Sequence, residues 1–492
     1  MISLAKLLEK IDYEILRGSL DKEISEVVND SRKVTKNSLF ICITGFDSDG
    51  HQYAESAVGN GATALVVEKD VDIFALGSIN PDITVIKVKD SRYAMAFISA
   101  AYYGYPADTL KVIGITGTKG KTTTTYIVKS ILESAGYKVG LVGTIETIIG
   151  DKHIPSSNTT PESLTLQGYF RQMLDEGIEI AVMEVASQGL KLHRTQGFTF
   201  ELGIFTNLSA DHIGPKEHDS FEDYMECKGR LFKQCRHGIV NADDKHTLDV
   251  IKGHTCNIET FGFNKDADIF AEDLSLTKKP GELGVNFTVK GKANFEAQVP
   301  TPGRFSVYNA LTAISICKYF NVDDDVIKEA LKSVHVKGRI EMVKTPYPFT
   351  LLIDYAHNEM SLESLLSTLR EYEPKRLIAL FGCGGDRAKD RRFSMGEVSG
   401  KLADFTIITS DNPRTEKPED IIADIVTGME KTDGKYICIV DRKDAIRYAI
   451  NNGKPGDVIV LAGKGHEDYQ EINGVKYPMD ERVLIKEILE EE

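Results

Sequence analysis

Short apolar runs alternate with segments of helical periodicity along most of this chain. In the middle of the chain the runs are VIGIT (112–116), IEIAVME (178–184), LGIF (202–205) and HGIV (237–240). Runs rich in valine and isoleucine, separated by helices, are typical of parallel strands joined by crossovers. A second series, FTLLID, RLIALF, ADFTII, YICIV and DVIVLA, begins at Phe349. The pattern therefore predicts an α/β fold with parallel sheets.

The pattern changes along the chain, and the changes indicate domain boundaries. The first hundred residues carry their own runs, SLFICITG and ATALVVEK, before Pro106 marks a linker. Later, LGVNFTVKGKANFEAQVP predicts a hairpin and RFSVYNALTAISICKYF a helix behind it. The second series of strands begins after VHVKGRIEMV. We therefore predict three domains, 1–107, 108–335 and 336–492.

Composition narrows the range of functions. The chain has 492 residues and a net charge of −15, which disfavours a nucleic-acid or anionic-membrane surface because those need basic stripes. Its seven cysteines include no C-x-x-C pair, so neither a disulfide framework nor a zinc ribbon is indicated. No apolar run approaches the roughly 20 residues of a membrane span. We expect a monomeric, cytoplasmic protein that acts on small molecules, without a nucleic-acid or membrane partner.

A glycine-rich turn after VIGIT carries the clearest chemical signal. Gly117 and Gly120 precede Lys121 and Thr122, where a helix is predicted to begin. In such a turn, backbone N–H groups and the helix N-terminus surround a phosphate, while the lysine and the hydroxyl reach the terminal phosphates and magnesium. The full pattern G-x-x-x-x-G-K-[ST] asks for glycine where this chain has Ile115. The turn still favours ATP binding, since turn chemistry alone does not explain Lys-Thr-Thr after two glycines.

Three further side chains of the middle series suit a metal site. Glu184 ends the run IEIAVME, His212 follows the next run, and Lys228 lies in YMECKGRLF. Carboxylate and imidazole both suit Mg²⁺ or Mn²⁺ when a substrate phosphate completes the coordination shell. Each residue alone also has an ordinary structural explanation, which for Lys228 is a solvated helix face. Their position beside the sheet that presents the phosphate loop favours a common site.

A series of short segments resembles the Mur ligase family. They run in order from NDSRKV at Asn29 to GKGHEDYQ at Gln470. The resemblance implies a three-domain architecture, with a P-loop-type central ATPase domain and a Rossmann-like C-terminal domain. It is strongest toward the members that add the third residue of the peptidoglycan stem peptide. The other segments are TGTKGKTTT, SSNTTPESL, MEVASQGLKLHR, TNLSADHIGPKEH, PGRFSVYNAL, KGRIEMV, IDYAHN, GCGGDR and SDNPRTE.

The resemblance implies an ATP-dependent ligase that extends UDP-N-acetylmuramoyl-L-alanyl-D-glutamate by one diamino acid. A carboxylate resists attack by an amine because its carbon is electron-rich and oxide cannot leave. The family therefore transfers the γ-phosphate of ATP to the carboxylate, and the amine then displaces phosphate from the acyl phosphate. Two Mg²⁺ ions are implied, the first beside Lys121 and Thr122. Glu184, His212 and a carbamylated Lys228 match the second.

The resemblance also assigns binding residues. Thr159 and Thr160 match positions that bind the peptide end of the nucleotide-sugar substrate, and Ser31 and Arg32 match a uridine-diphosphate region. A solvated turn explains Ser31 and Arg32 equally well. The residues implied for ATP are Gly117, Thr118, Gly120, Lys121, Thr122, Thr123, Asn309, Arg339 and Asp354. Those implied for the UDP-sugar peptide are Ser31, Arg32, Thr159, Thr160, Ser187 and Arg194.

The third domain is expected to choose the amino acid. Meso-diaminopimelate differs from L-lysine by a carboxylate beside its distal amine, so a selective pocket needs a fixed cation. In the resemblance Arg414 of SDNPR supplies it through two parallel hydrogen bonds. Alternatively, Arg414 caps the following helix, and the amino acid is L-lysine. We expect meso-diaminopimelate. The residues implied for the pocket are Arg392, Asp411, Asn412, Arg414, Gly463 and Glu467.

Some positions depart from the usual family pattern. Lys119 stands where the family commonly has Asn, Gln188 stands where many members have His, and DHIGPKEH places His218 differently.

Two other functions compete with the ligase. A folylpolyglutamate synthase shares the middle domain but lacks DNPR, and it lacks the first domain with its DSR. A nucleotide-binding scaffold with a dead site predicts loss of residues such as Lys121 and Glu184, which are present. The ligase interpretation is favoured.

Overall fold

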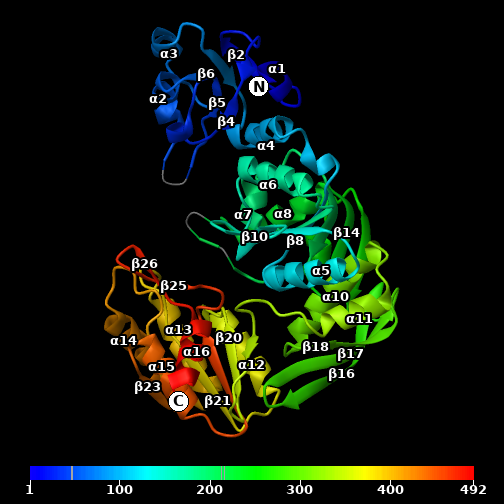
Figure 1. Cartoon of the computed structure of the whole chain (residues 1–492), viewed down its shortest axis with the longest axis vertical. Coiled ribbons are helices and arrows are strands. Elements are labelled where there is room, and N and C mark those ends of the chain that lie inside the picture. The colour runs from blue at the N-terminus through cyan, green and yellow to red at the C-terminus, as the bar shows by residue number, and fades with distance from the viewer. Residues whose placement is uncertain (46–47, 212, 215–216, 492) are drawn as a thin grey trace. The chain divides into compact units, whose positions relative to one another are not determined.

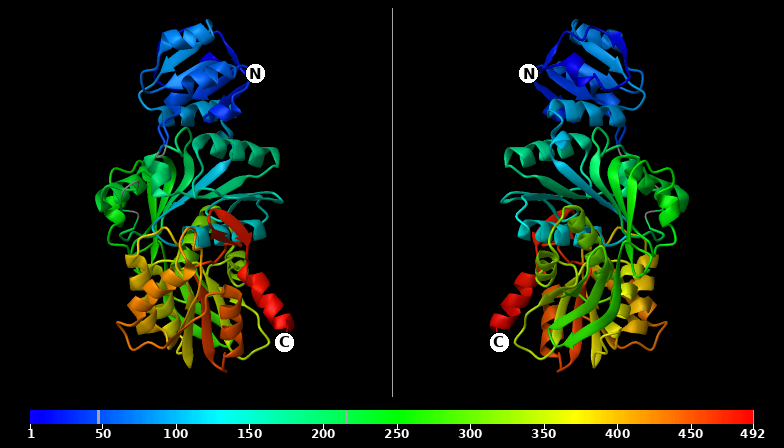
Figure 2. Two further views of the ribbon diagram at one scale, coloured as in Figure 1. Left: turned by 90° about the vertical axis from the view of Figure 1, so that its left-hand side faces the viewer. Right: turned by 90° about the vertical axis from the view of Figure 1, so that its right-hand side faces the viewer.

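The computed structural model describes residues 1–45, 48–211, 213–214 and 217–491. The chain forms two compact units, one of residues 1–269 with 312–323 and one of residues 270–311 with 324–492. Figures 1 and 2 show helices layered on sheets within each unit. The α/β class expected from the sequence is confirmed. The domain boundaries after residues 107 and 335 stay predictions.

The first unit opens with a five-stranded sheet in the order β2-β7-β6-β5-β4. Strands β4 to β7 are parallel and β2 is antiparallel. Successive residues of β5 face opposite sides, so Leu39 packs in a core with Ile98 of α4 while Phe40 packs in a core with Ala57 of α2. The elements are β1 (Ile2–Ser3), α1 (Leu4–Leu7), β2 (Glu14–Arg17), β3 (Glu23–Ile24), β4 (Glu26–Val28), β5 (Ser38–Ile41), α2 (Ala54–Gly59), β6 (Ala62–Val67), α3 (Ile73–Ile79), β7 (Thr84–Lys87) and α4 (Ser91–Tyr102).

A mainly parallel sheet follows, and its strand β8 leads into the glycine-rich turn. Its order within this unit is β11-β10-β9-β12-β8-β13-β14-β15, with β10 and β11 antiparallel. The register sets Glu184 at the end of β12 level with Ile115 of β8, so both strand ends meet at one edge. The sequence pattern did not predict the β10–β11 hairpin. The elements are β8 (Lys111–Thr116), α5 (Lys121–Ser134), β9 (Val139–Val142), β10 (Glu146–Ile149), β11 (Lys152–Pro155), α6 (Ser163–Asp175), β12 (Ile180–Glu184), α7 (Ser187–Lys191), β13 (Phe200–Phe205), α8 (Phe221–Gly229), β14 (Cys235–Asn241), α9 (Thr247–Val250) and β15 (Asn257–Gly262).

The second unit contains the predicted hairpin and the second parallel sheet. Strands β17 and β18 pair antiparallel, as LGVNFTVKGKANFEAQVP predicts. The C-terminal sheet has the order β19-β20-β24-β21-β22-β23, and only β19 is antiparallel to its neighbour. The elements up to this sheet are β16 (Ile269–Lys279), β17 (Glu282–Gly291), β18 (Phe295–Val299), α10 (Arg304–Tyr319) and α11 (Asp324–Leu331).

Helices cover both faces of the C-terminal sheet, as its apolar strands require. In β21, Phe381 packs with Met395 of α13 on one face, while Leu380 packs with Ile446 of α15 on the other. The elements are β19 (Glu341–Val343), β20 (Thr350–Asp354), α12 (Glu359–Arg370), β21 (Arg376–Phe381), α13 (Asp390–Leu402), β22 (Phe405–Ile408), α14 (Pro418–Met429), β23 (Tyr436–Cys438), α15 (Arg442–Asn451), β24 (Asp457–Ala462), β25 (Tyr469–Ile472), β26 (Val475–Pro478) and α16 (Glu481–Glu491).

The structure bears on two expectations drawn from composition, which concern membrane-spanning helices and cysteine pairing. Among the described residues, no helix combines the length and apolar character needed to cross a bilayer. All seven cysteines are free, and only Cys438 among them is exposed.

A buried ion pair joins the last two helices to the strand ends of the C-terminal sheet. Arg442 of α15 pairs with Glu481 of α16 at 2.8 Å, and their side chains are 2 % and 0 % exposed. Arg442 also donates to the carbonyl oxygens of Ser410 and Ala462, which end or follow β22 and β24. Burial raises the pKa of Glu481, which the charge of Arg442 opposes.

We predict that Arg442→Met destabilises the second unit by about 3–5 kcal/mol, because it leaves the Glu481 carboxyl buried without its cation. A lower midpoint of thermal unfolding, followed by circular dichroism, checks this. Arg447→Met is the matched control on the same helix, since Arg447 is partly exposed and pairs at the surface. The prediction fails if both variants unfold at the wild-type temperature.

Candidate active site

The turn between β8 and α5 has the backbone shape of an anion-binding loop. Gly117 and Gly120 take φ values of 149° and 88°, which L side chains disfavour. A Cβ on Gly117 would collide with Oγ1 of Thr206. Asn207, after β13, fixes the turn by accepting from the Lys119 N–H and donating to the Lys119 carbonyl, both at 2.9 Å. The N-terminus of α5 is thereby presented to the loop, as phosphate binding requires.

Two lysine side chains reach the same backbone oxygen of this loop. Lys121 Nζ lies 2.8 Å from Gly117 O and 3.1 Å from Thr118 O, and Lys228 Nζ lies 3.0 Å from Gly117 O. Lys228 also lies over the ring of Tyr224, 4.4 Å from its centroid. Lys228 is 1 % exposed, and burial, then the charge of Lys121, lowers its pKa well below the usual value. The solvated helix face considered for Lys228 is therefore wrong.

Glu184 gathers hydrogen-bond donors at the end of β12. Its Oε2 accepts from Thr122 Oγ1 at 2.9 Å and from Thr144 Oγ1 at 3.1 Å, and its Oε1 accepts from the Thr144 N–H at 2.8 Å. Thr144 Oγ1 lies a further 3.0 Å from Thr159 Oγ1. This set of hard oxygen ligands fits Mg²⁺. The other predicted ligand, His212, lies outside the described residues.

The segment SSNTTPE folds back on β12 and is tied to two arginines. Thr160 Oγ1 donates to the carbonyl oxygen of Glu184 at 2.9 Å. Arg194 donates to the Thr160 carbonyl at 3.0 Å and pairs with Glu162 at 2.8 Å. Glu162 also pairs with Arg92 of α4 at 3.0 Å. The predicted substrate residues Thr160 and Arg194 therefore come together.

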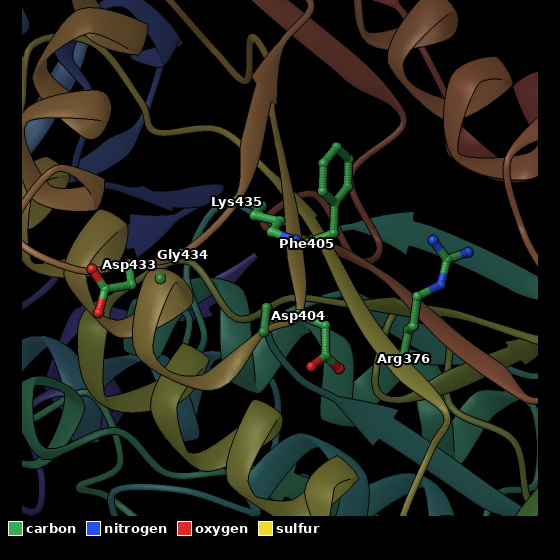
Figure 3. Close-up of a pocket in the computed structure, with 8 residues that line it drawn as sticks. Arg376, Asp404, Phe405, Asp433, Gly434 and Lys435 are labelled. Carbon is green, nitrogen blue, oxygen red and sulfur yellow. The ribbon is translucent and has the colours of Figure 1, made fainter.

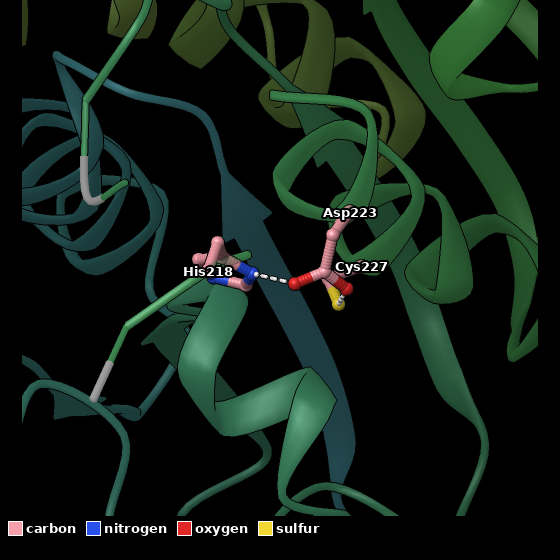
Figure 4. Close-up of side chains that lie close together, drawn as sticks. All are labelled: His218, Asp223 and Cys227. Carbon is pink, nitrogen blue, oxygen red and sulfur yellow. Dashed lines mark hydrogen bonds and ion pairs between the residues drawn. The ribbon is translucent and has the colours of Figure 1, made fainter. Parts of the chain in front are cut away.

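A line of hydrogen bonds joins Ser187 at the start of α7 to α8. Ser187 Oγ lies 2.9 Å from His218 Nε2, and His218 Nδ1 lies 3.0 Å from Asp223 Oδ2. Asp223 Oδ2 accepts from Lys191 Nζ at 2.8 Å, and Cys227 Sγ donates to Asp223 Oδ1 at 3.5 Å. His218, Asp223 and Cys227 lie close enough to hold a metal ion (Figure 4). Both ring nitrogens and both carboxylate oxygens already have protein partners, so the cluster forms a hydrogen-bonded chain.

The remaining residues predicted for ATP lie on elements of the second unit. Asp354, at the end of β20, accepts from two backbone N–H groups at 2.8 Å. Burial raises the pKa of its carboxyl, which the charge of Arg339 opposes. The Arg339 guanidinium lies over the ring of Tyr355, 4.8 Å from its centroid. Asn309 is buried in α10. Their contact with ATP stays a prediction.

The predicted amino-acid pocket is organised by a lysine that the sequence prediction missed. Lys464 Nζ lies 2.8 Å from Asn412 Oδ1 and 2.8 Å from Glu467 Oε2, and Asn412 Nδ2 donates to the same Glu467 oxygen at 3.0 Å. Lys464 is 0 % exposed, with Asp411 4.0 Å away. Gly463 takes a φ of 108°, and a Cβ there would lie 2.9 Å from Asp411 Oδ2. Asp411, Asn412, Gly463 and Glu467 therefore share one site.

Arg414 is oriented by two contacts within the second unit. Its Nη1 donates to the Gly385 carbonyl at 2.7 Å, and its Nε pairs with Glu471 at 3.1 Å. Helix α14 begins at Pro418, and its N-cap residue is Lys417. Arg414 therefore does not cap this helix, which removes the alternative role considered for it.

Arg392 is engaged by two carboxylates of its own chain. It is 1 % exposed, and its terminal nitrogens contact Glu416 at 2.6 and 2.9 Å and Asp424 of α14 at 2.9 Å. The hydrogen bond from Arg392 lowers the pKa of Glu416 to about 2. In this conformation Arg392 joins α13 to the start of α14. Its contact with a substrate carboxylate stays a prediction.

Ser31 and Arg32 form a short 3₁₀ turn after β4. Arg32 pairs with Asp30 at 2.9 Å, and its side chain is 87 % exposed. Asp30 also accepts from the Arg32 N–H, as in a turn stabilised by its own first residue. Their contact with a uridine diphosphate stays a prediction.

A surface pocket of 560 Å³ lies at the amino ends of strands in the C-terminal sheet (Figure 3). Arg376 begins β21 and Phe405 begins β22, whereas the predicted amino-acid residues follow the strands' carboxyl ends. Arg376 pairs with Asp457, and Asp404 pairs with Arg370. Two charged residues of the pocket are thus already paired within the protein. It is lined by Arg376, Gly400, Ala403, Asp404, Phe405, Asp433, Gly434 and Lys435.

Sequence reasoning missed Glu162, Lys464 and Asp223 at these sites. Glu162 lies in SSNTTPESL and Lys464 in GKGHEDYQ, so a charged side chain close to a predicted binding residue was the signal that could have identified each of them. Asp223 lies outside these motifs, five residues after His218, and nothing in that spacing indicates the hydrogen bond between them. Only the folded chain brings Ser187 to this pair.

Comparison with known proteins agrees with the motif series. The description "Mur ligase family, catalytic domain" matches residues 23–103, "Mur ligase middle domain" matches 115–317, and "Mur ligase, glutamate ligase domain" matches 338–465. Together the matched ranges cover well over half of the chain.

Relatives with a curated name match along the whole chain. The UDP-N-acetylmuramoyl-L-alanyl-D-glutamate–2,6-diaminopimelate ligase of Caldanaerobacter subterraneus subsp. tengcongensis is 45% identical over 490 residues, 99% of each chain. The protein of that name from Clostridium perfringens is 43% identical over 495 residues, again 99% of each chain. A solved structure of a ligase of that name superposes with a TM-score of 0.72 at 29% identity, covering 100% of this chain and 99% of the other.

Proposed function

The chain belongs to the Mur ligase family, and from this premise we propose that it joins meso-diaminopimelate to UDP-N-acetylmuramoyl-L-alanyl-D-glutamate, using ATP, in peptidoglycan synthesis. One observation carries the proposal. A phosphate loop with Lys121, Glu184 and Lys228 beside it occurs in a chain that aligns from end to end with ligases of that name. L-lysine as the amino acid is the alternative outcome of the test.

The reaction must first activate a carboxylate of the dipeptide. Phosphoryl transfer from ATP turns the carboxylate oxygen into a leaving group, and the amine of the diamino acid then displaces phosphate. Such transfer depends mainly on positioning and on cancelling charge over the phosphate oxygens. The backbone of the loop from Gly117 to Gly120 binds the phosphates, and the ammonium of Lys121, held at this loop by two carbonyls, supplies a point charge.

Magnesium is supported by the chemistry of the ligands around Glu184. The Glu184 carboxylate lies within hydrogen-bond distance of the Thr122 and Thr144 hydroxyls. Hard oxygen ligands that leave room for substrate phosphate suit Mg²⁺. Thr122 would hold the ion nearer the ATP phosphates and Glu184 the ion nearer the acceptor, with His212 as a further ligand. When bound, Mg²⁺ neutralises negative charge on the phosphate oxygens.

Carbamylation of Lys228 is the second part of this proposal. An amine must be neutral to take up carbon dioxide, and burial lowers the pKa of Lys228 in that direction. A carbamate places an anion beside the Lys121 ammonium, so the two side chains attract each other. It also gives Mg²⁺ a further oxygen ligand.

We assign the nucleotide-sugar peptide to the residues gathered at β12 and α7. Thr160 and Arg194 hydrogen-bond to each other, and Thr159 is linked through Thr144 to Glu184. The peptide end bound by these residues then lies at the same sheet edge as the phosphate loop, where acyl phosphate forms. Ser31 and Arg32 would bind the uridine diphosphate.

The amino acid is assigned to the pocket around Asn412 in the second unit. Arg414 would bind the carboxylate that distinguishes meso-diaminopimelate from L-lysine, and Arg392 the other carboxylate. Glu467, already hydrogen-bonded to Lys464 and Asn412, offers an anion for the distal amine. Since a lysine ligand leaves the Arg414 guanidinium without its partner, the pocket rejects it.

Phosphate release tests the proposed function directly. The purified protein is given ATP and Mg²⁺ with UDP-N-acetylmuramoyl-L-alanyl-D-glutamate and either meso-diaminopimelate or L-lysine, and the product is identified by mass. A folate with glutamate is the comparison for a folylpolyglutamate synthase. ATP hydrolysis that depends on neither acceptor would contradict a ligase.

We predict that Lys121→Ala lowers the ligation rate by about 10²–10³, because a group that stabilises transition-state charge is lost while the backbone of the loop remains. Lys129→Ala is the matched control further along α5, where Lys129 pairs with Glu133 at the surface. Steady-state phosphate release measures both. Turnover above about a tenth of wild type in Lys121→Ala would sink the assignment.

A second prediction concerns the charge at position 228. Lys228→Ala is expected to be nearly inactive and to regain part of its activity when a short carboxylic acid is added, because the site needs an anion there. Lys233→Ala, an exposed lysine just beyond α8, is the control and should be unaffected. Intact mass of gently handled protein should show the addition of one carbon dioxide. Full activity with an unmodified Lys228 would overturn the carbamate.

A third prediction concerns substrate choice. The wild-type protein should prefer meso-diaminopimelate over L-lysine by at least about a hundredfold in kcat/KM, since a charged hydrogen bond contributes about 1.5–3 kcal/mol and two are expected. Arg414→Ala should lose most of this preference, and Arg414→Lys should recover little because it cannot form the paired contact. Unchanged KM for ATP in both variants shows that the fold is intact. Equal use of L-lysine by the wild type would change the substrate assignment but not the reaction.

A further inference from the structure

The buried chain from Asp223 through His218 to Ser187 has a defined direction. His218 is 0 % exposed and Ser187 is 4 % exposed, so water competes little for their hydrogen bonds. The ring of His218 lies between the two partners, with Asp223 Oδ2 at 3.0 Å from Nδ1 and Ser187 Oγ at 2.9 Å from Nε2. Figure 4 shows His218 and Asp223 facing each other.

The charges around Asp223 decide which ring nitrogen carries the proton. Burial alone would raise the pKa of Asp223, but hydrogen bonds from Lys191 and His218 hold it well below its usual value. An ionised carboxylate only accepts, so Nδ1 of His218 must donate to it. Burial lowers the pKa of His218, which keeps the ring neutral near pH 7. Nε2 is therefore an acceptor, and the Ser187 hydroxyl donates its hydrogen to it.

This direction changes what Ser187 can offer to a ligand. A free hydroxyl rotates and can donate or accept. Because the hydrogen of Ser187 is held by His218, only the lone pairs of Oγ remain for a ligand. Ser187 begins α7, three residues after Glu184, on the same stretch of chain that Thr160 binds. An N–H group of a bound peptide is the complementary partner.

We propose that His218 is a positioning residue that fixes Ser187 as a hydrogen-bond acceptor for an amide N–H of the peptide part of the nucleotide-sugar substrate, with Asp223 and Lys191 holding the ring. The inference rests on the proposed function, whose substrate carries that peptide. It adds a role for the histidine that the segment DHIGPKEH places differently from the usual family pattern. Ser187 forms no covalent bond in this role.

Three variants separate this role from a purely structural one. His218→Phe keeps a ring but offers no acceptor, whereas His218→Gln places an amide oxygen near the position of Nε2. Ser187→Ala removes the hydroxyl itself. Glu222→Gln is the matched control, since Glu222 is an exposed acid next to Asp223 on α8. Each variant is checked by its thermal midpoint and its KM for ATP.

The readout is binding of the UDP-muramoyl dipeptide, measured by calorimetry without ATP, together with its KM and kcat in the ligation assay. His218→Phe and Ser187→Ala should each weaken binding about tenfold, the size expected for one lost hydrogen bond in a desolvated site. kcat should stay within about a factor of two, because the contact is the same in the ground and transition states. His218→Gln should restore most of the affinity.

The double variant Ser187→Ala/His218→Phe decides the matter. It should bind no more weakly than Ser187→Ala, because His218 acts only through the Ser187 hydroxyl. Additive losses, a His218→Gln variant as weak as His218→Phe, or an equal rise in the KM for ATP would each overturn the proposal. Mass addition of substrate on Ser187 would also overturn it in favour of a nucleophile. Wild-type protein that binds the dipeptide but ligates no amino acid would instead overturn the proposed function, so the two failures are distinguishable.

Discussion

Lys121 and Lys228 both contact the carbonyl oxygen of Gly117, and the chemistry of the first unit depends on this constraint. Lys228 is fully buried, so an ammonium there is disfavoured by lost hydration and again by the charge of Lys121. Bringing an anion to this point relieves both effects. Under the proposed function, nucleotide phosphate would bring such an anion, and a carbamate on Lys228 would replace the ammonium by one. The Glu184 carboxylate is also buried, and it accepts hydrogen bonds from Thr122 and Thr144.

The sheets were predictable because their strands are buried on both faces. In β21, Leu380 and Phe381 face opposite cores, so successive buried positions must both be apolar, and the apolar run from Leu377 to Phe381 is the result. The phosphate loop was predictable for a different reason. Gly117 and Gly120 adopt backbone conformations that other residues disfavour, so their spacing before Lys121 carries the geometry in the sequence itself.

Contacts between distant segments left no comparable mark. Ser187 and His218 are 31 residues apart, and neither has a neighbour in the sequence that announces the pairing. The alternative of a solvated helix face for Lys228 could not be excluded from the sequence, because the burial of Lys228 depends on how α8 packs under the phosphate loop. The short β10–β11 hairpin was missed since β11 is largely exposed and therefore lacks an apolar alternation. A sequence pattern reflects burial and backbone conformation within one segment. These three features leave no such pattern.

In the second unit, buried cations again set the positions of nearby polar groups. Buried Lys464 holds Asn412 and Glu467, and buried Arg442 holds the carbonyls at the ends of β22 and β24 that support them. Because these cations are committed to the protein, they fix the geometry of the pocket. Arg414 differs: it is held through Nε and Nη1, which leaves the Nη2 edge of its guanidinium without a hydrogen bond among the described residues. In the proposed amino-acid pocket, Arg414 is thus oriented before a ligand arrives, so less ordering is required on binding. Under the proposed function, discrimination between meso-diaminopimelate and L-lysine comes from a carboxylate that either pairs with Arg414 or leaves it unpaired.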